Sequence, residues 1–113
     1  MDASLNPQAL TALRNITPTP LIIDVRREPV FQTAPDMIAG AQRHDPAKVA
    51  DWSGALPRDA RIVVYCVHGH EVSQIAAKAL CERGLQAQFL EGGLEAWRAA
   101  GGRLQPNSAL GGK

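Results

Sequence analysis

The 113-residue sequence contains only two cysteines, Cys66 and Cys81, and no long apolar run. Two cysteines cannot build the disulfide framework of a small secreted protein. The longest aliphatic runs, such as residues 21–23 and 62–64, are far too short to span a bilayer. The first residues have neither the basic nor the apolar segment of a secretory signal. We therefore expect a cytoplasmic protein that does not bind membranes.

The sequence also has little excess of charge of either sign. Lysine and arginine number 12 against 11 aspartates and glutamates, which leaves a net charge of +1 with histidine neutral, and the basic residues form no run. This balance argues against a nucleic-acid partner. The length suits one domain. We predict a single domain over residues 1–105 and a flexible C-terminal tail over residues 106–113, which is rich in glycine and polar residues.

Segments typical of strands and of helices alternate along the chain. Apolar, β-branched runs predict strands at residues 21–25, 61–65 and 87–90. Capping residues and apolar periodicity predict helices at 7–14, 46–52, 73–83 and 94–100. The alternation predicts an α/β fold, with a central, mostly parallel sheet flanked by helices on both faces.

Cys66 directly follows the clearest strand, and the next helix is predicted to begin at Ser73. Ligands of parallel sheets bind at the carboxyl ends of the strands. Unpaired N–H groups at the start of a helix attract anions and favour a nucleophilic thiolate over a thiol. Gly69, in the middle of the loop, can adopt the positive φ that a tight curl needs. A buried, inert cysteine is the alternative, and the loop by itself leaves both interpretations open.

Two histidines, His68 and His70, flank the loop glycine. Either could supply positive charge or exchange a proton, or both could simply face solvent. Glu71 fits best as a negative charge near the start of the helix. The spacing Cys66-x-His68-x-His70 is also compatible with metal ligands, but His44 is the only other histidine in the chain. We therefore expect no metal and no other cofactor.

Four segments in order carry a family resemblance. They are Asp24-Val25-Arg26 with Glu28, Ile38-Ala39-Gly40-Ala41, Val63-Val64-Tyr65-Cys66, and Leu90-Glu91-Gly92-Gly93-Leu94 with Trp97. Over nearly its whole length the chain resembles the rhodanese-like, single-domain thiosulfate sulfurtransferases.

The resemblance implies a rhodanese-like fold and a persulfide carried on Cys66. It implies a small-molecule sulfur donor such as thiosulfate and an acceptor such as cyanide or a thiol, which a protein could also provide. Asp24 and Arg26 would support the loop. The residues implied to bind the substrate are Val67, His68, Gly69, His70, Glu71, Val72 and Ser73.

The sequence departs from the family pattern in the loop. An arginine often precedes the helix in catalytic members, whereas this chain has Glu71 and Val72 there, and Ser73 comes one residue late. The predicted loop is thus one residue longer, which resembles dual-specificity phosphatases and arsenate reductases, yet those enzymes depend on the arginine. A non-catalytic binding or regulatory module is the main alternative, and an oxyanion-handling enzyme the other. Met37 stands where the family often has histidine.

Overall fold

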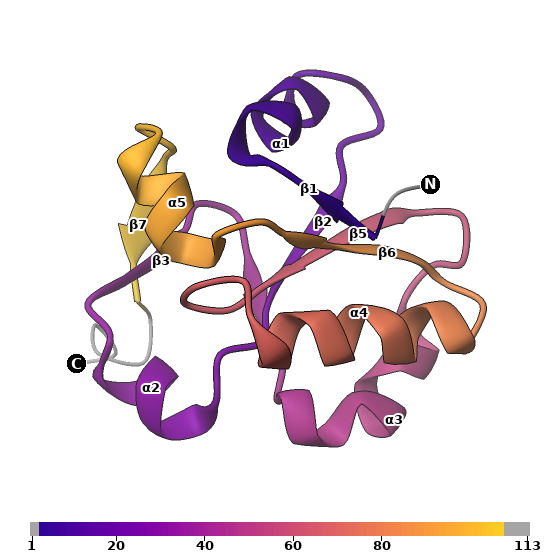
Figure 1. The fold of residues 1–113 in the computed structure, drawn as a ribbon. Helices are drawn as coiled ribbons and strands as arrows, with labels where there is room; N and C mark the ends of the chain where they lie inside the picture. The colour runs from indigo at the N-terminus through magenta and orange to yellow at the C-terminus, as the bar shows by residue number, and fades with distance from the viewer. Residues whose placement is uncertain (1–2, 108–113) are drawn as a thin grey trace.

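The computed structural model describes residues 3–107 and contains a five-stranded parallel sheet, with strands in the order β1-β6-β5-β2-β4. A second, antiparallel pair joins β3 to β7. This arrangement confirms the predicted α/β fold with a central parallel sheet (Figure 1). The strands are β1 (Ser4–Leu5), β2 (Leu21–Asp24), β3 (Asp36–Ile38), β4 (Gln42–Arg43), β5 (Arg61–Tyr65), β6 (Gln86–Leu90) and β7 (Leu104–Pro106).

Helices cover both faces of the central sheet. One face carries α1 and α5, and the other carries α3 and α4 (Figure 1). The helices are α1 (Pro7–Arg14), α2 (Glu28–Thr33), α3 (Val49–Trp52), α4 (Glu71–Glu82) and α5 (Gly93–Ala99). Short 3₁₀ turns at Pro46–Lys48 and Ser53–Ala55 flank α3. None of the helices within residues 3–107 is long and apolar enough to cross a membrane.

The central position of β5 in the sheet explains why its sequence is apolar throughout and does not alternate between apolar and polar residues. Val63 and Tyr65 belong to the core under α1 and α5, while Ile62 and Val64 belong to the core under α4. Successive side chains of a strand point to opposite faces, so a strand buried on both faces needs apolar residues throughout. Burying each aliphatic side chain contributes about 1.5–3 kcal/mol.

Two helices begin at the capping residues from which their starts were predicted. The Asn6 side chain accepts a hydrogen bond from the Ala9 N–H at 2.8 Å, and the Asp45 side chain accepts one from the Ala47 N–H at 2.9 Å. Each satisfies a backbone donor that the first turn leaves unpaired.

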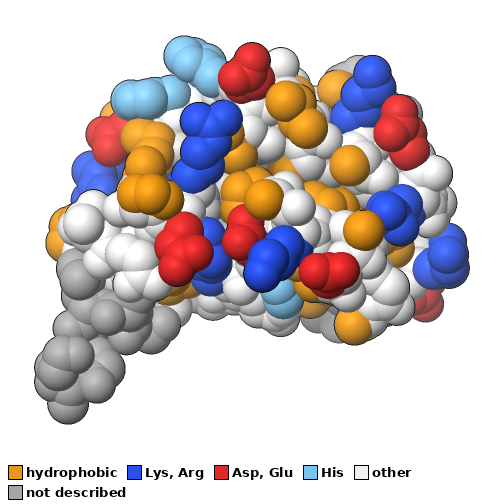
Figure 2. Space-filling view, turned by 90° about the horizontal axis from the view of Figure 1, so that it is seen from below, with side chains coloured by type: hydrophobic (Ala, Val, Ile, Leu, Met, Phe, Trp, Pro, Cys, Tyr) orange, Lys and Arg blue, Asp and Glu red, His pale blue; other side chains and the backbone are white. Residues whose placement is uncertain are grey.

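The charged side chains are mixed in sign on the face that carries α3 and α4. Figure 2 shows acidic and basic residues interspersed among apolar ones, with no large area of one sign. The near-neutral net charge of the sequence is therefore also locally balanced on this face.

The predicted start of one helix was wrong, because α4 begins at Glu71, two residues before Ser73. Between the predicted strands at 21–25 and 61–65, where only a helix at 46–52 is predicted, the structure also contains α2 and two short strands. The packed domain extends beyond residue 105, because Pro106 pairs with Asp36 and the buried Asn107 side chain donates hydrogen bonds to the backbone of α2. The rest of the predicted tail, 108–113, lies outside the described residues.

Candidate active site

Cys66 lies at the carboxyl end of β5, where the sequence places it, beside β2 in the middle of the sheet. The residue is buried, with 7% of its surface exposed. Its Sγ atom is 3.2 Å from the Oγ of Ser73, which is fully buried in the first turn of α4. The hydroxyl of Ser73 can therefore donate a hydrogen bond to the sulfur when the thiol is ionised.

The carbonyl groups around the cysteine are held by the start of α5. The Leu94 N–H donates to the Cys66 carbonyl at 2.9 Å, and the Glu95 N–H donates to the Val67 carbonyl at 3.0 Å. These are N–H groups that the first turn of a helix cannot pair internally. Helix α5 thus fixes the orientation of the peptide groups that follow the cysteine.

The amide groups of the same loop are left free. None of the backbone N–H groups of residues 67–73 donates a hydrogen bond to another residue within 3–107. Several loop carbonyls are paired, by contrast: the Gly69 oxygen accepts from the Gln74 side chain at 3.0 Å, and the His70 oxygen accepts from the Gln74 N–H at 3.2 Å. A loop with paired carbonyls and unpaired amides at a helix start presents a binding site for an anion.

Two glycines allow this loop and α5 to approach each other closely. Gly69 and Gly93 both have positive φ, +71° and +61°. A Cβ atom on Gly93 would lie 2.5 Å from the Cys66 oxygen and 2.6 Å from both the Gly69 nitrogen and the Val67 oxygen. Only glycine fits at this contact between the loop and α5.

A cavity of ≈ 260 Å³ opens over the cysteine. Much of its wall is apolar, from Val30, Val67 and Val72, and the exposed residues His68, His70 and Arg27 add polar groups. Its lining residues are Arg26, Arg27, Val30, Cys66, Val67, His68, His70, Glu71 and Val72.

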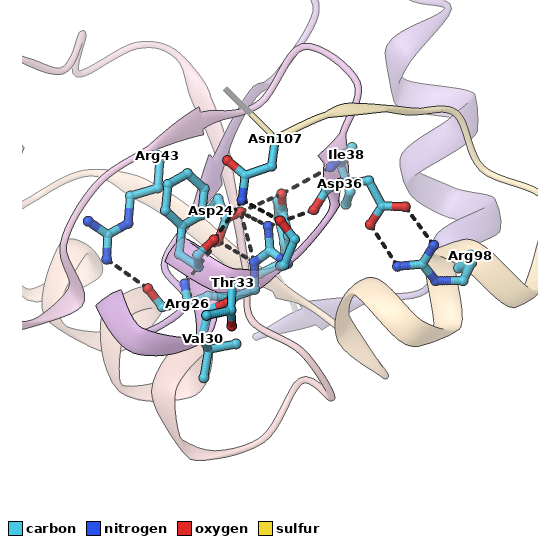
Figure 3. Close-up of polar contacts among 12 residues, drawn as sticks. Asp24, Arg26, Val30, Thr33, Asp36, Ile38, Arg43, Arg98 and Asn107 are labelled. Atoms are coloured by element: carbon cyan, nitrogen blue, oxygen red, sulfur yellow. Dashed lines mark hydrogen bonds and ion pairs between the residues drawn. The ribbon is translucent and has the colours of Figure 1, made fainter. Parts of the chain in front are cut away.

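A buried ion pair supports the loop from below. The Arg26 guanidinium lies 2.7 Å from the Asp24 carboxylate, and both side chains are almost fully buried. Arg26 Nη2 also donates to the Asp36 carbonyl at 3.0 Å, so both Nε and Nη2 are engaged within the protein (Figure 3). Arg26 lines the cavity with its charge paired to Asp24, and its supporting role for the loop stays a prediction.

Tyr65 completes this network. Its hydroxyl donates to Asp24 at 2.9 Å and accepts from the Ile38 N–H at 3.1 Å. Burial, together with the nearby Asp24 carboxylate, raises the pKa of Tyr65 well above its usual value, so the hydroxyl remains a proton donor. The end of β2, the end of β5 and β3 are therefore tied together directly beside Cys66.

The structure gathers all of the predicted loop residues around the cysteine, with one correction. Glu71, Val72 and Ser73 belong to the first turn of α4, so the loop between Cys66 and the helix is only Val67–His70. The helix therefore begins earlier than predicted, while the one-residue insertion between Cys66 and Ser73 relative to the family pattern stays a prediction. Glu71 is exposed in the first turn, where a negative charge is favourable. The rings of His68 and His70 lie 6.0 Å apart.

Two residues of the site are not among those predicted. Arg27 and Val30 line the cavity, in a stretch for which the sequence predicted no helix or strand. Their signal was the short stretch after Arg27, which begins with glutamate and proline as helices often do. Gly93 appeared only as part of the family motif, because no local sequence signal indicates that it contacts the Cys66 loop.

The fold and this geometry define a class: a small parallel α/β domain with one cysteine held in a loop of free amides between a central strand and a helix. The family model of the rhodanese-like domain matches residues 6–100. The chain therefore belongs to the rhodanese-like family, which confirms the resemblance drawn from its four motifs.

Curated relatives include the thiosulfate sulfurtransferase GlpE of Pseudomonas fluorescens, 38% identical over 79 residues, which cover 69% of this chain and 70% of the relative. GlpE of Stutzerimonas stutzeri is 34% identical over 93 residues, covering 81% of each. Among solved structures, a Lactobacillus plantarum protein superimposes with a TM-score of 0.81 at 26% identity, covering 92% of this chain and 88% of that one. The rhodanese-like domain of the Anabaena Alr3790 protein gives 0.78 at 27%, covering 93% and 80%.

Proposed function

We propose that this protein is a rhodanese-type sulfurtransferase that moves sulfane sulfur from a donor such as thiosulfate to cyanide or a thiol through a persulfide on Cys66. The observation that carries the proposal is the set of unpaired N–H groups at residues 67–73 around a buried sulfur. The relatives named thiosulfate sulfurtransferase support the same reaction class.

In the first half-reaction the Cys66 thiolate attacks the outer sulfur of thiosulfate. A bond forms between Sγ and that sulfur, the sulfur–sulfur bond of the donor breaks, and its electron pair leaves with sulfite. The free amides of the loop stabilise first the thiolate and then the anionic terminal sulfur of the persulfide, in a site where most water is excluded. The Ser73 hydroxyl adds one further donor at the Sγ atom.

In the second half-reaction a nucleophilic acceptor attacks the terminal sulfur. Cyanide forms thiocyanate, a thiolate forms a new persulfide, and in either case the bond to Sγ breaks and the Cys66 thiolate is regenerated. No external oxidant or reductant is required, because the sulfane sulfur moves at one oxidation level. A reducing compartment such as the cytoplasm would keep Cys66 and Cys81, both free, in the thiol form.

The loop lacks a fixed cation, and this shapes how the donor is recognised. Arg26 is committed to Asp24, so Arg27 at the cavity rim is the guanidinium available to attract an anionic donor. Arg27 is exposed and makes no ion pair within residues 3–107. We expect it to contribute to donor binding and leave the chemical step to the loop amides.

The test is a thiosulfate:cyanide assay that follows thiocyanate on the wild type, on Cys66→Ser and on Cys81→Ser. Cys81 is the matched control, because it is an exposed cysteine outside the Cys66 cavity, with its Sγ donating to the Ala87 carbonyl at 3.2 Å. We expect turnover in the wild type and in Cys81→Ser, and none in Cys66→Ser. Mass spectrometry after thiosulfate treatment should find one added sulfur atom on Cys66.

A different result would favour the main alternative, a non-catalytic binding module. If neither thiosulfate nor an organic persulfide adds sulfur to Cys66, the sulfurtransferase proposal fails. The phosphatase-like alternative lacks the arginine on which such enzymes depend, since the position expected for it holds Val72.

A further inference from the structure

A second cavity is lined by the C-terminal ends of α1 and α5, two helices that lie on the same face of the sheet. Its volume is ≈ 340 Å³. Thr11, Arg14 and Asn15 line it from the end of α1, and Trp97 and residues 100–103 line it from the end of α5. It shares no lining residue with the cavity over Cys66.

Two guanidinium groups at this cavity form no ion pair with a carboxylate of residues 3–107. Nη2 of Arg14 donates to the Ala39 carbonyl at 2.6 Å, but its buried Nη1 has no hydrogen-bond partner among these residues. The Arg103 side chain is exposed and makes no hydrogen bond or ion pair within residues 3–107. Burial and the charge of Arg103 both lower the pKa of Arg14, as expected for two like charges that face each other.

The guanidinium groups are not needed to pair the carbonyl groups at the two helix ends, because most of these carbonyls already accept hydrogen bonds. At the end of α1, the Asn15 side chain pairs the Thr11 oxygen, and backbone N–H groups pair the oxygens of Ala12 and Leu13. At the end of α5, backbone N–H groups pair the oxygens of residues 96, 97 and 98. The last turns are therefore capped by the backbone, and the free guanidinium N–H groups remain unused.

A shared aromatic contact holds the two arginines in place. The Arg14 guanidinium lies 5.8 Å from the centroid of the Trp97 ring, and the Trp97 indole N–H donates to the Arg103 carbonyl at 2.9 Å. Trp97 is itself buried in the core. Trp97 thus contacts the Arg14 guanidinium and fixes the backbone of Arg103, and no carboxylate of residues 3–107 pairs with either arginine.

We propose that this cavity, the Arg14–Arg103 site, binds a phosphate-class oxyanion: inorganic phosphate or the phosphate group of a small phosphate ester. Planar guanidinium groups match the oxygen geometry of such anions, and two of them supply several charge-assisted hydrogen bonds. The Thr11 hydroxyl is a further donor at the cavity wall. The volume exceeds that of the anion alone and leaves room for a small organic group.

The test is a titration of ¹⁵N-labelled protein with sodium phosphate, compared with sodium chloride at equal ionic strength. Amide signals of residues 11–15 and 100–103 should shift along a saturable curve that chloride does not reproduce. Signals of residues 67–73 report the Cys66 loop separately, so binding at the two places is distinguished. Repeating the titration with glycerol phosphate separates free phosphate from a phosphate ester as the preferred ligand.

Arg103→Gln is the decisive variant, because its side chain makes no contact on which folding depends. It should weaken phosphate binding about tenfold or more. Lys78→Gln is the matched control, since it removes the same charge from the exposed surface of α4 and should leave binding unchanged. Shifts confined to residues 67–73, shifts equal to those in chloride, or equal affinity in Arg103→Gln and the wild type would each overturn the proposal.

Discussion

Gly93→Ala tests whether α5 positions the Cys66 loop. The new Cβ would collide with the Cys66 oxygen at 2.5 Å and with the Gly69 nitrogen at 2.6 Å. A left-handed alanine costs about 1–2 kcal/mol. Separating the loop from α5 also removes the hydrogen bonds that Leu94 and Glu95 donate to it, each with a net contribution of about 1 kcal/mol. We expect the free energy of unfolding in urea to fall by about 3–4 kcal/mol.

Gly101→Ala is the matched control for this substitution. Gly101 also has positive φ, +80°, but a Cβ atom there would meet nothing within 4 Å. It should therefore lose only the backbone component, about 1–2 kcal/mol, and keep full thiosulfate:cyanide activity. Gly93→Ala should in addition lose about a hundredfold in kcat/KM, because the free amides move relative to Sγ. Equal stability and equal activity of the two variants would refute the positioning role of α5.

Three further predictions concern single side chains. Ser73→Ala removes the hydroxyl that lies 3.2 Å from Sγ and could donate to the ionised sulfur. It should lower kcat about tenfold at unchanged stability, by steady-state assay and urea melts, and an unchanged kcat would exclude the hydroxyl from the reaction. Arg27→Gln should raise the KM for thiosulfate several-fold with kcat preserved, and this effect should vanish at high salt. Burial, and secondarily the charge of Arg43, lowers the pKa of His44 from its usual 6.5. As the pH falls through 6.5 the unfolded chain therefore takes up a proton before the folded one, and the free energy of unfolding should fall. His44→Asn should weaken this pH dependence in urea melts at several pH values.

The central strands and the position of the cysteine could be predicted from sequence because their signals are local. Residues 61–65 form an aliphatic run with turn residues on either side, and Cys66 must then lie at the carboxyl end of the resulting strand. The family motifs added the fold and the reaction class. The start of α4 was misplaced because His70 caps the helix without a side-chain hydrogen bond, so the usual capping signal is missing.

The remaining parts could not be predicted because they depend on contacts between distant segments. Strand β7 exists only by pairing with β3, and Ile38 and Leu104 are far apart in the chain. Arg26 could have faced the donor or a carboxylate, and only the folded structure shows its pairing with Asp24. Short strands and buried ion pairs leave no periodic pattern in the sequence.

The two outer strands of the central sheet are its shortest. β1 and β4 contain two residues each, whereas the inner strands β2, β5 and β6 contain four or five. An exposed strand edge offers unpaired backbone groups on which another chain can add, the first step toward aggregation. With only Ser4–Leu5 and Gln42–Arg43 at its borders, this sheet offers a second molecule almost no template, so the protein should remain dispersed at concentrations where long-edged sheets polymerise.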